Sequence, residues 1–280
     1  MKRLASRFSL NPSRRQRALQ NGHFRKARDQ MTPKQQNGVF QALSSRVAVL
    51  MLASLMAIAP QQTPAQNAER REIIHYQKNI RINRNNHEEL AREFLRFRPD
   101  TISLQEIASS DKVLLDLLKD TYPSQHYCHV KHLSGIAALS RWPMVEGTQT
   151  CFGGWGIAGF QVEMPEGRVW VLSAHIEVFL DGLRPDIVRA LIPQLEDLEG
   201  SVILGGDFNS EPFFTSTVAL AKAARVRRIG RSVPTFELFD RIGISIDHVM
   251  ATGGEGVIMQ RPKLTSDHFG VVSRFSMHFL

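Results

Sequence analysis

Cysteine is nearly absent from this sequence, which contains only Cys128 and Cys151 among its 280 residues. The pair could form one disulfide in an oxidising compartment, or stay as two buried free thiols, which are chemically inert. Sequence alone does not show whether the two sulfurs meet. Both interpretations therefore stay open at this point.

Acidic residues are scarce at the start of the chain. Residues 1–65 hold 11 Lys and Arg against a single acid, Asp29, whereas residues 66–280 hold 24 basic and 26 acidic residues and carry a formal charge of −2. The overall charge of +8 therefore comes from the leader. Because the rest of the chain is not basic, its charge gives no argument for a polyanionic partner such as nucleic acid.

The apolar run at residues 47–59 is shorter than the roughly 20 residues that a membrane-spanning helix needs. A basic stretch precedes it, and small residues follow it, which is typical of a signal peptide cleaved after Ala65 or Ala68. Translation from Met31 would give this signal an ordinary length. We therefore expect residues 1–65 to be a basic leader with a signal peptide, and the protein to be periplasmic or secreted; the alternative is a membrane anchor at 47–59.

Residues 66–280 show no internal repeat and no linker, so we expect one domain of alternating strands and helices. Helical periodicity predicts helices at 86–97, 111–119 and 184–198. Short apolar runs between turn residues predict strands at 73–79, 101–105, 126–132, 136–140, 157–163, 168–174, 201–204, 244–250 and 269–276.

Polar side chains stand where five of these strands end, and a rigid sheet can aim several such side chains at one point. They are Asn79, Glu106, Asp207 with Asn209, Asp247 with His248, and Asp267 with His268. Taken singly, each has an ordinary structural explanation, such as a helix cap or an Asx turn. Taken together, carboxylate and amide oxygens without cysteine are the ligands of a hard cation, Mg²⁺ before Mn²⁺ or Ca²⁺, rather than those of zinc.

In chain order these residues belong to short motifs that together resemble the endonuclease/exonuclease/phosphatase superfamily, over about residues 73–275. The motifs are Gln77-Lys78-Asn79, Leu104-Gln105-Glu106, Leu139-Ser140-Arg141-Trp142-Pro143, Ser173-Ala174-His175, Gly206-Asp207-Phe208-Asn209, Ile246-Asp247-His248 and Ser266-Asp267-His268. The resemblance implies an α/β fold, a four-layer α/β sandwich in which two packed mixed, mainly antiparallel sheets are covered by helices. It also implies a pocket at one rim.

The resemblance further implies a metal centre. Glu106 would be the main ligand of Mg²⁺, with Mn²⁺ as the alternative ion. Asn79 and Asp267 would lie near the ion or the phosphate.

The remaining roles that the resemblance implies are catalytic. His268 would be the general acid or base, and Asp247 would hold its ring in the required tautomer. Asp207 and Asn209 would position the water and the phosphoryl oxygens, and His175 would face the phosphate. Arg141, together with Asn209, would bind substrate.

We therefore expect an exported, divalent-metal-dependent phosphoesterase that hydrolyses a phosphodiester by in-line attack of an activated water, with nucleic acid as the first candidate substrate. The alternatives are a phospholipid head-group phosphodiesterase or a phosphatase, since one site can serve several phosphate esters. A non-catalytic binding protein of the same fold is the least favoured interpretation. No protein partner is indicated, and a monomer is expected.

Two other clusters have ordinary explanations. The first cluster consists of His126, Cys128, His129 and His132. A metal site is disfavoured there because alternate side chains of a strand face opposite ways. The second cluster is a basic patch at Arg225, Arg227, Arg228 and Arg231. We interpret it as a solvated helix end rather than as a contact with a phosphate backbone.

Overall fold

The structure is a computed structural model, and it describes residues 71–82, 86–130, 134–152, 156–179, 182–183 and 185–280. The predicted leader, its apolar run and its cleavage sites lie outside the described residues. Of the helices in the described ranges, none combines the length and the hydropathy needed to cross a bilayer.

Two six-stranded sheets form the centre of the fold. The first has the strand order β15 (Glu255–Arg261), β16 (Gly270–Ser276), β1 (Glu72–Asn79), β2 (Thr101–Ile107), β4 (Gly135–Ser140) and β3 (Ser124–His129). The second has the order β11 (Arg227–Arg228), β14 (Asp247–Ala251), β10 (Ser201–Asp207), β7 (Gly167–His175), β6 (Ile157–Met164) and β5 (Thr150–Phe152). Only the β1–β2 and β7–β10 pairs of these sheets are parallel, so both sheets are mixed and mainly antiparallel, as predicted.

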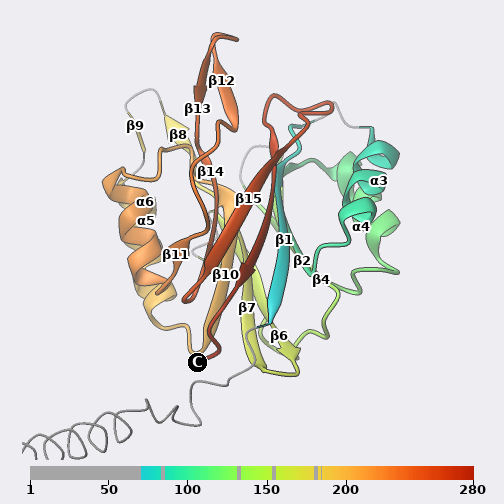
Figure 1. Cartoon of the computed structure of the whole chain (residues 1–280), viewed down its shortest axis with the longest axis vertical. Helices are drawn as coiled ribbons and strands as arrows, with labels where there is room; N and C mark the ends of the chain where they lie inside the picture. Colours follow the sequence, from blue (N-terminus) through green and yellow to red (C-terminus); the bar gives the residue numbers. More distant parts are fainter. Residues whose placement is uncertain (1–70, 83–85, 131–133, 153–155, 180–181, 184) are drawn as a thin grey trace, which may run out of the picture. The chain divides into compact units, whose positions relative to one another are not determined.

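Helices cover the outer face of each sheet. Figure 1 shows α3 (His87–Phe97) and α4 (Lys112–Leu118) on one side of the two sheets, and α5 (Pro185–Glu196) and α6 (Thr215–Ala223) on the other. The four-layer sandwich expected from the resemblance is confirmed. The remaining short elements are a 3-10 helix (Ser109–Asp111) and two small hairpins, β8 (Val178–Phe179) with β9 (Gly182–Leu183), and β12 (Phe236–Leu238) with β13 (Ile242–Ile244).

Burial of apolar side chains explains the layers. On the first outer face, Leu90 and Phe94 of α3 pack with Leu104 of β2, and on the second, Leu191 of α5 packs with Leu204 of β10. A third cluster lies between the sheets and contains residues from both. The helices are therefore held by the apolar stripe that the sequence shows, because removing such surfaces from water stabilises the packed state.

A disulfide joins Cys128 of β3 to Cys151 of β5. Because β3 belongs to the first sheet and β5 to the second, the bond links the two sheets covalently. The alternative of two free thiols is therefore wrong. Because its sulfur is bonded, Cys128 is not available as a metal ligand. His129, the next residue of the same strand, is exposed, as expected for alternating strand faces.

Candidate active site

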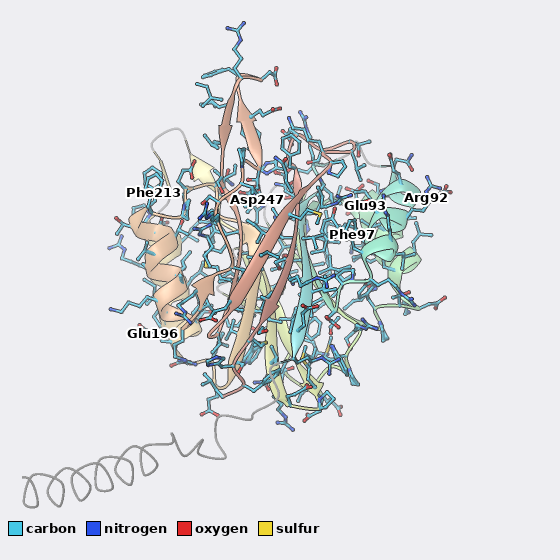
Figure 2. The ribbon with its side chains drawn as sticks, in the orientation of Figure 1. Arg92, Glu93, Phe97, Glu196, Phe213 and Asp247 are labelled. Carbon is cyan, nitrogen blue, oxygen red and sulfur yellow. A yellow bond between two sulfur atoms is a disulfide. The ribbon has the colours of Figure 1, made fainter. Side chains whose placement is uncertain are left out.

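Strand order explains why the polar strand ends meet. Parallel neighbours end at the same edge of a sheet, and here Asn79 lies opposite Gln105, while Asp207 lies opposite His175. Asp207 is also paired with Asp247, the first residue of the antiparallel strand β14. Figure 2 shows Asp247 close to the base of the β12–β13 hairpin, which protrudes beyond this edge.

Glu106 reaches the cluster because β2 is irregular at its end. The β2–β4 register shifts between Leu104 and Ile107, and Glu106 has a φ of 58°. A bulge of this kind redirects one side chain of a strand. The conformation is uncommon for a residue other than glycine, and such backbone outliers gather at functional sites.

Asn79 links carboxylates from the two sheets. Its Nδ2 donates to Glu106 Oε1 and to Asp207 Oδ2, both at 3.0 Å, while its Oδ1 accepts from the Arg81 amide. In this arrangement Asn79 presents a donor to the cluster and its oxygen is engaged elsewhere. Direct ligation of a metal by Asn79 stays a prediction, whereas its contact with Glu106 is in place.

His268 forms a buried pair with Asp247. Its Nδ1 lies 2.9 Å from Asp247 Oδ2, and its Nε2 lies 3.7 Å from Asp207 Oδ2. Burial alone would lower the pKa of His268, but the charge and hydrogen bond of Asp247 outweigh burial and raise that pKa to about 9. The imidazole is therefore protonated at neutral pH.

Asp207 and His175 complete the centre of the cluster. Asp207 is buried, and burial together with the nearby Asp247 charge raises the pKa of its carboxyl group, against the opposing effect of His268 and His175. His175 Nε2 lies 3.8 Å from Asp207 Oδ2 and 3.9 Å from Glu106 Oε1. The structure thus brings His175 together with Glu106 and Asp207, while its expected contact with phosphate stays a prediction.

Asn209 lies beside this centre with a φ of 48°. Its backbone N–H donates to Asp207 Oδ1 at 2.8 Å, and its Nδ2 donates to the Ile176 carbonyl at 3.1 Å. Asn209 therefore holds both the Asp207 carboxylate and the segment that follows His175.

Glycine is required at position 206, next to Asp207. A Cβ at Gly206 would collide with the backbone carbonyl of Ala174 on the neighbouring strand β7. This close approach keeps the ends of β7 and β10 in contact, and thereby keeps His175 beside Asp207.

Two predicted residues lie apart from the buried cluster. Asp267 is at the rim, where its Oδ2 lies 3.5 Å from Arg81 Nη1 and its side chain is 39% exposed. Arg141 lies elsewhere: it follows β4, pairs with Asp100 at 3.3 Å and so sits at the end of β2 opposite to Glu106, about 20 Å away along the strand. The structure does not bring Arg141 to the site, because β4 runs antiparallel to β2.

Sequence reasoning assigned no role to two buried neighbours of Asn79. Gln77 Nε2 donates to Asp247 Oδ1 and to Gln105 Oε1, both at 2.8 Å. Lys78 Nζ donates to the carbonyls of Lys263 at 2.9 Å and His268 at 2.6 Å, on the segment that carries His268 itself. The signal for Lys78 was a charged residue inside a strand that the sequence predicts to be buried, since such a residue is rarely buried without specific partners.

The donor atoms fit a hard divalent ion. One ligand atom each from Glu106, His175 and Asp207 lie within 4.8 Å of one another, and a second group of this kind combines Asp207, Asp247 and His268. Carboxylates gathered at partly buried positions repel one another, and a cation relieves that repulsion. The predominance of oxygen donors matches Mg²⁺ or Mn²⁺ chemistry.

Two packed sheets thus bring carboxylates and histidines together at one shared edge. The model of the Endonuclease/Exonuclease/phosphatase family matches residues 77–268, and the chain belongs to this family. Its members hydrolyse phosphate esters and depend on divalent metal ions. A comparison with curated proteins finds no match.

Solved structures share the fold at low sequence identity. An endonuclease/exonuclease/phosphatase family protein from Leptotrichia buccalis C-1013-b has a TM-score of 0.58 and 15% identity, covering 72% of this chain and 99% of its own. Truncated TDP2 from Caenorhabditis elegans has a TM-score of 0.54 and 17% identity, covering 73% and 98%. Sphingomyelinase C from Streptomyces griseocarneus has a TM-score of 0.54 and 15% identity, covering 74% and 100%.

Proposed function

We propose that this protein is an exported, divalent-metal-dependent phosphodiesterase that hydrolyses its substrate by in-line attack of water, with nucleic acid as the first candidate substrate. The observation that carries the proposal is the meeting of Glu106, Asp207 and His175 beside the His268–Asp247 pair. Nucleic acid comes first because the family description names endonucleases and exonucleases.

The metal would be held by Glu106, with Asn79 beside it and Asp267 at the rim of the site, and Mg²⁺ is the first choice for such donors. When bound, a divalent ion supplies neutralisation of the charge that develops on the phosphoryl oxygens.

The residues of the chain divide the proton transfers between them. Asp207 has a raised pKa, and its carboxylate is held in place by the Asn79 side chain and the Asn209 backbone N–H, so it suits a base that orients and deprotonates the attacking water. His268 is protonated at neutral pH and suits an acid that gives a proton to the leaving oxygen from Nε2. Asp247 holds the opposite nitrogen, so the proton-donating face of the ring is fixed.

A second candidate is a phosphodiesterase of phospholipid head groups. The β12–β13 hairpin lies beside the site, since Phe236 pairs with His268, and it exposes Phe239 and Ile242 by 80% and 58%. Exposed apolar side chains at the rim of a site suit a substrate held in a lipid surface. The structural likeness to a sphingomyelinase C agrees with this alternative.

The test uses the purified protein with bis-(p-nitrophenyl) phosphate, plasmid DNA, and vesicles of a choline phospholipid, each with Mg²⁺ or with EDTA. We expect turnover that EDTA abolishes and Mg²⁺ restores, with the preferred substrate identifying the candidate. His268→Ala and Asp207→Ala should each lower kcat by about a hundredfold or more, the usual contribution of a positioned acid or base.

The control is His278→Ala, a change of an exposed histidine at the far end of β16. Turnover that ignores EDTA would contradict the metal-dependent mechanism, and wild-type rates in folded His268→Ala and Asp207→Ala would contradict the site. Export is checked by sequencing the amino terminus of the protein recovered from the periplasm or medium, with Gln66 as the expected first residue.

A further inference from the structure

A cavity of about 340 Å³ lies between α6 and the second sheet, at the edge strand β11 and its neighbour β14. Met250 of β14 lines it and belongs to the apolar cluster under the helices, whereas the flanking Val249 and Ala251 face the space between the sheets. The cavity is thus on the helical side of the second sheet. It is separate from Glu106 and the rest of the candidate active site, and its volume is in the range of small-molecule sites.

Arg228 lines this cavity with a charge that nothing in the described chain neutralises. The residue is partly buried, it forms no ion pair within the described chain, and its Nη1 is buried without a hydrogen-bond partner. A partly buried cation without a counter-charge is costly, so an anion bound in the cavity would be favoured. Burial lowers the pKa of His248; the Ser210 carbonyl and Asp247 oppose this, and the charge of Arg228 adds a smaller lowering effect.

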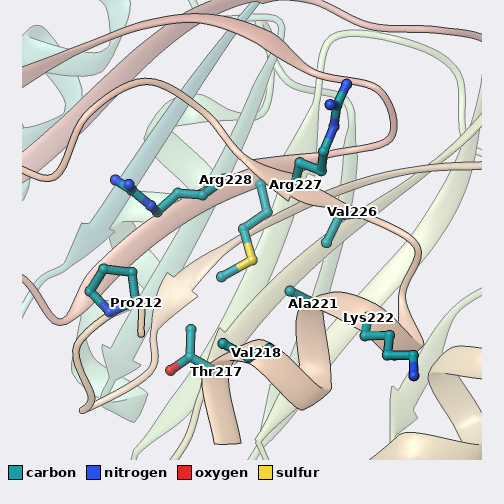
Figure 3. Close-up of a pocket in the computed structure, with 9 residues that line it drawn as sticks. Pro212, Thr217, Val218, Ala221, Lys222, Val226, Arg227 and Arg228 are labelled. Carbon is teal, nitrogen blue, oxygen red and sulfur yellow. The ribbon is translucent and has the colours of Figure 1, made fainter. Parts of the chain in front are cut away.

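The other walls define the rest of the ligand. Val218, Ala221, Val226 and Met250 give the cavity an apolar side. Arg227 and Lys222 add two further cations, and Figure 3 shows Lys222 on the opposite side of Met250 from Arg228. None of the described residues that line the cavity is acidic. An anion with an apolar body would satisfy Arg228 and cover the apolar side at once.

We infer that this cavity is a second binding site, one that takes an amphipathic oxyanion, with its phosphate or carboxylate head on Arg228 and its apolar group against Met250 and Val226. Arginine pairs with both kinds of head because its fork of N–H groups matches two oxygens. The inference is independent of the proposed catalytic function, since no residue of the catalytic cluster lines the cavity.

The experiment is isothermal titration calorimetry on the full-length protein in EDTA, with hexyl phosphate as the probe. We expect one bound equivalent, and we expect Arg228→Met to weaken binding by about tenfold or more, as loss of a charge-assisted pair does. Arg231→Met is the matched control, because Arg231 is exposed and does not line the cavity. Ala221→Leu, which fills the apolar side without touching Arg228, should weaken binding as well.

Three further probes test the parts of the inference. Hexanoate that binds like hexyl phosphate identifies the carboxylate as an equally good head and supports the site. Hexanol binding as tightly as hexyl phosphate overturns recognition by charge, and inorganic phosphate binding as tightly overturns the apolar subsite. The inference also fails if hexyl phosphate does not bind, or if Asp207→Asn abolishes binding while Arg228→Met and Ala221→Leu leave it unchanged.

Discussion

His268 has a carboxylate near each ring nitrogen, and the two carboxylates have different tasks. Asp247 is hydrogen-bonded to Nδ1 at 2.9 Å, while Asp207 lies 3.7 Å from Nε2. In the proposed mechanism, Asp247 would keep the ring protonated, and Nε2 would give its proton to the leaving group on the Asp207 side.

The first prediction at this scale concerns Asp247→Asn. Removing the charge lowers the pKa of His268 from about 9, so the acid form should be lost at a lower pH. The alkaline limb of the kcat profile, which should fall as pH rises through about 9 in the wild type, should move towards neutral pH. Measurement of kcat between pH 5 and 10 checks this, with Asp240→Asn in the exposed hairpin as control. An unmoved limb would show that another group sets it.

The second residue-scale prediction concerns His75, which is buried between Thr101 and Ser103 and outside the catalytic cluster. Burial lowers its pKa to about 3, whereas an unfolded histidine has a pKa of about 6.5. The unfolded chain thus takes up a proton between these values and the folded chain does not, so stability is lost as pH falls below 6.5.

From pH 6.5 to pH 5 this linkage amounts to a loss of about 2 kcal/mol in the free energy of unfolding. Urea unfolding at both pH values measures the loss, and His75→Gln should make it smaller by about that amount. His129→Gln, at an exposed position, should leave the pH dependence as it is. Equal pH dependence in all three proteins would exclude His75 as the source.

At the scale of elements, the site depends on how closely β10 approaches β7. Gly206→Ala places a methyl group against the Ala174 carbonyl, and a backbone atom cannot rotate away. We expect a loss of about 1–3 kcal/mol in stability, typical of overpacking, and a large loss of kcat because Asp207 and His175 separate. Thermal unfolding and kcat together check this. A fully active, equally stable variant would mean that the strands can part without cost.

Much of the element pattern was predictable from the sequence, but irregular and edge elements were not. The strand bearing Gly205-Gly206-Asp207 follows from an apolar run into a polar end. The edge strand β15 was missed because it is largely exposed, so Val257 and Met259 give no core-facing alternation. The bulge at Glu106 was also invisible, because a register shift depends on the partner strand β4.

The placement of Arg141 failed for a related reason. A motif read in chain order does not show at which end of a sheet its residues lie. Asn79 and Glu106 stand at the same end of the paired strands β1 and β2, whereas Asp207 comes from the second sheet, so the resemblance rather than strand pairing predicted that it joins them. Gln77 and Lys78 were quoted within a motif, yet their partners come from distant segments and only the fold reveals them.

At the scale of the whole molecule, the Cys128–Cys151 disulfide fastens the two sheets across 23 residues of sequence. Closing a loop of that length in the unfolded chain stabilises the fold by about 3 kcal/mol in the chain-entropy description. Urea unfolding with and without dithiothreitol should show this loss. The Cys128→Ala/Cys151→Ala double variant should be insensitive to dithiothreitol; a wild type that is equally insensitive would mean that the bond adds no stability.

The candidate site is divided between the sheets: Asn79, Glu106 and His268 come with the first, and His175, Asp207 and Asp247 with the second. An isolated sheet, however well formed, would hold only half of the reacting groups. A refolding chain should therefore regain its circular dichroism before it regains turnover. The rate at which turnover returns would therefore report the last step of folding, in which the two sheets pack against each other.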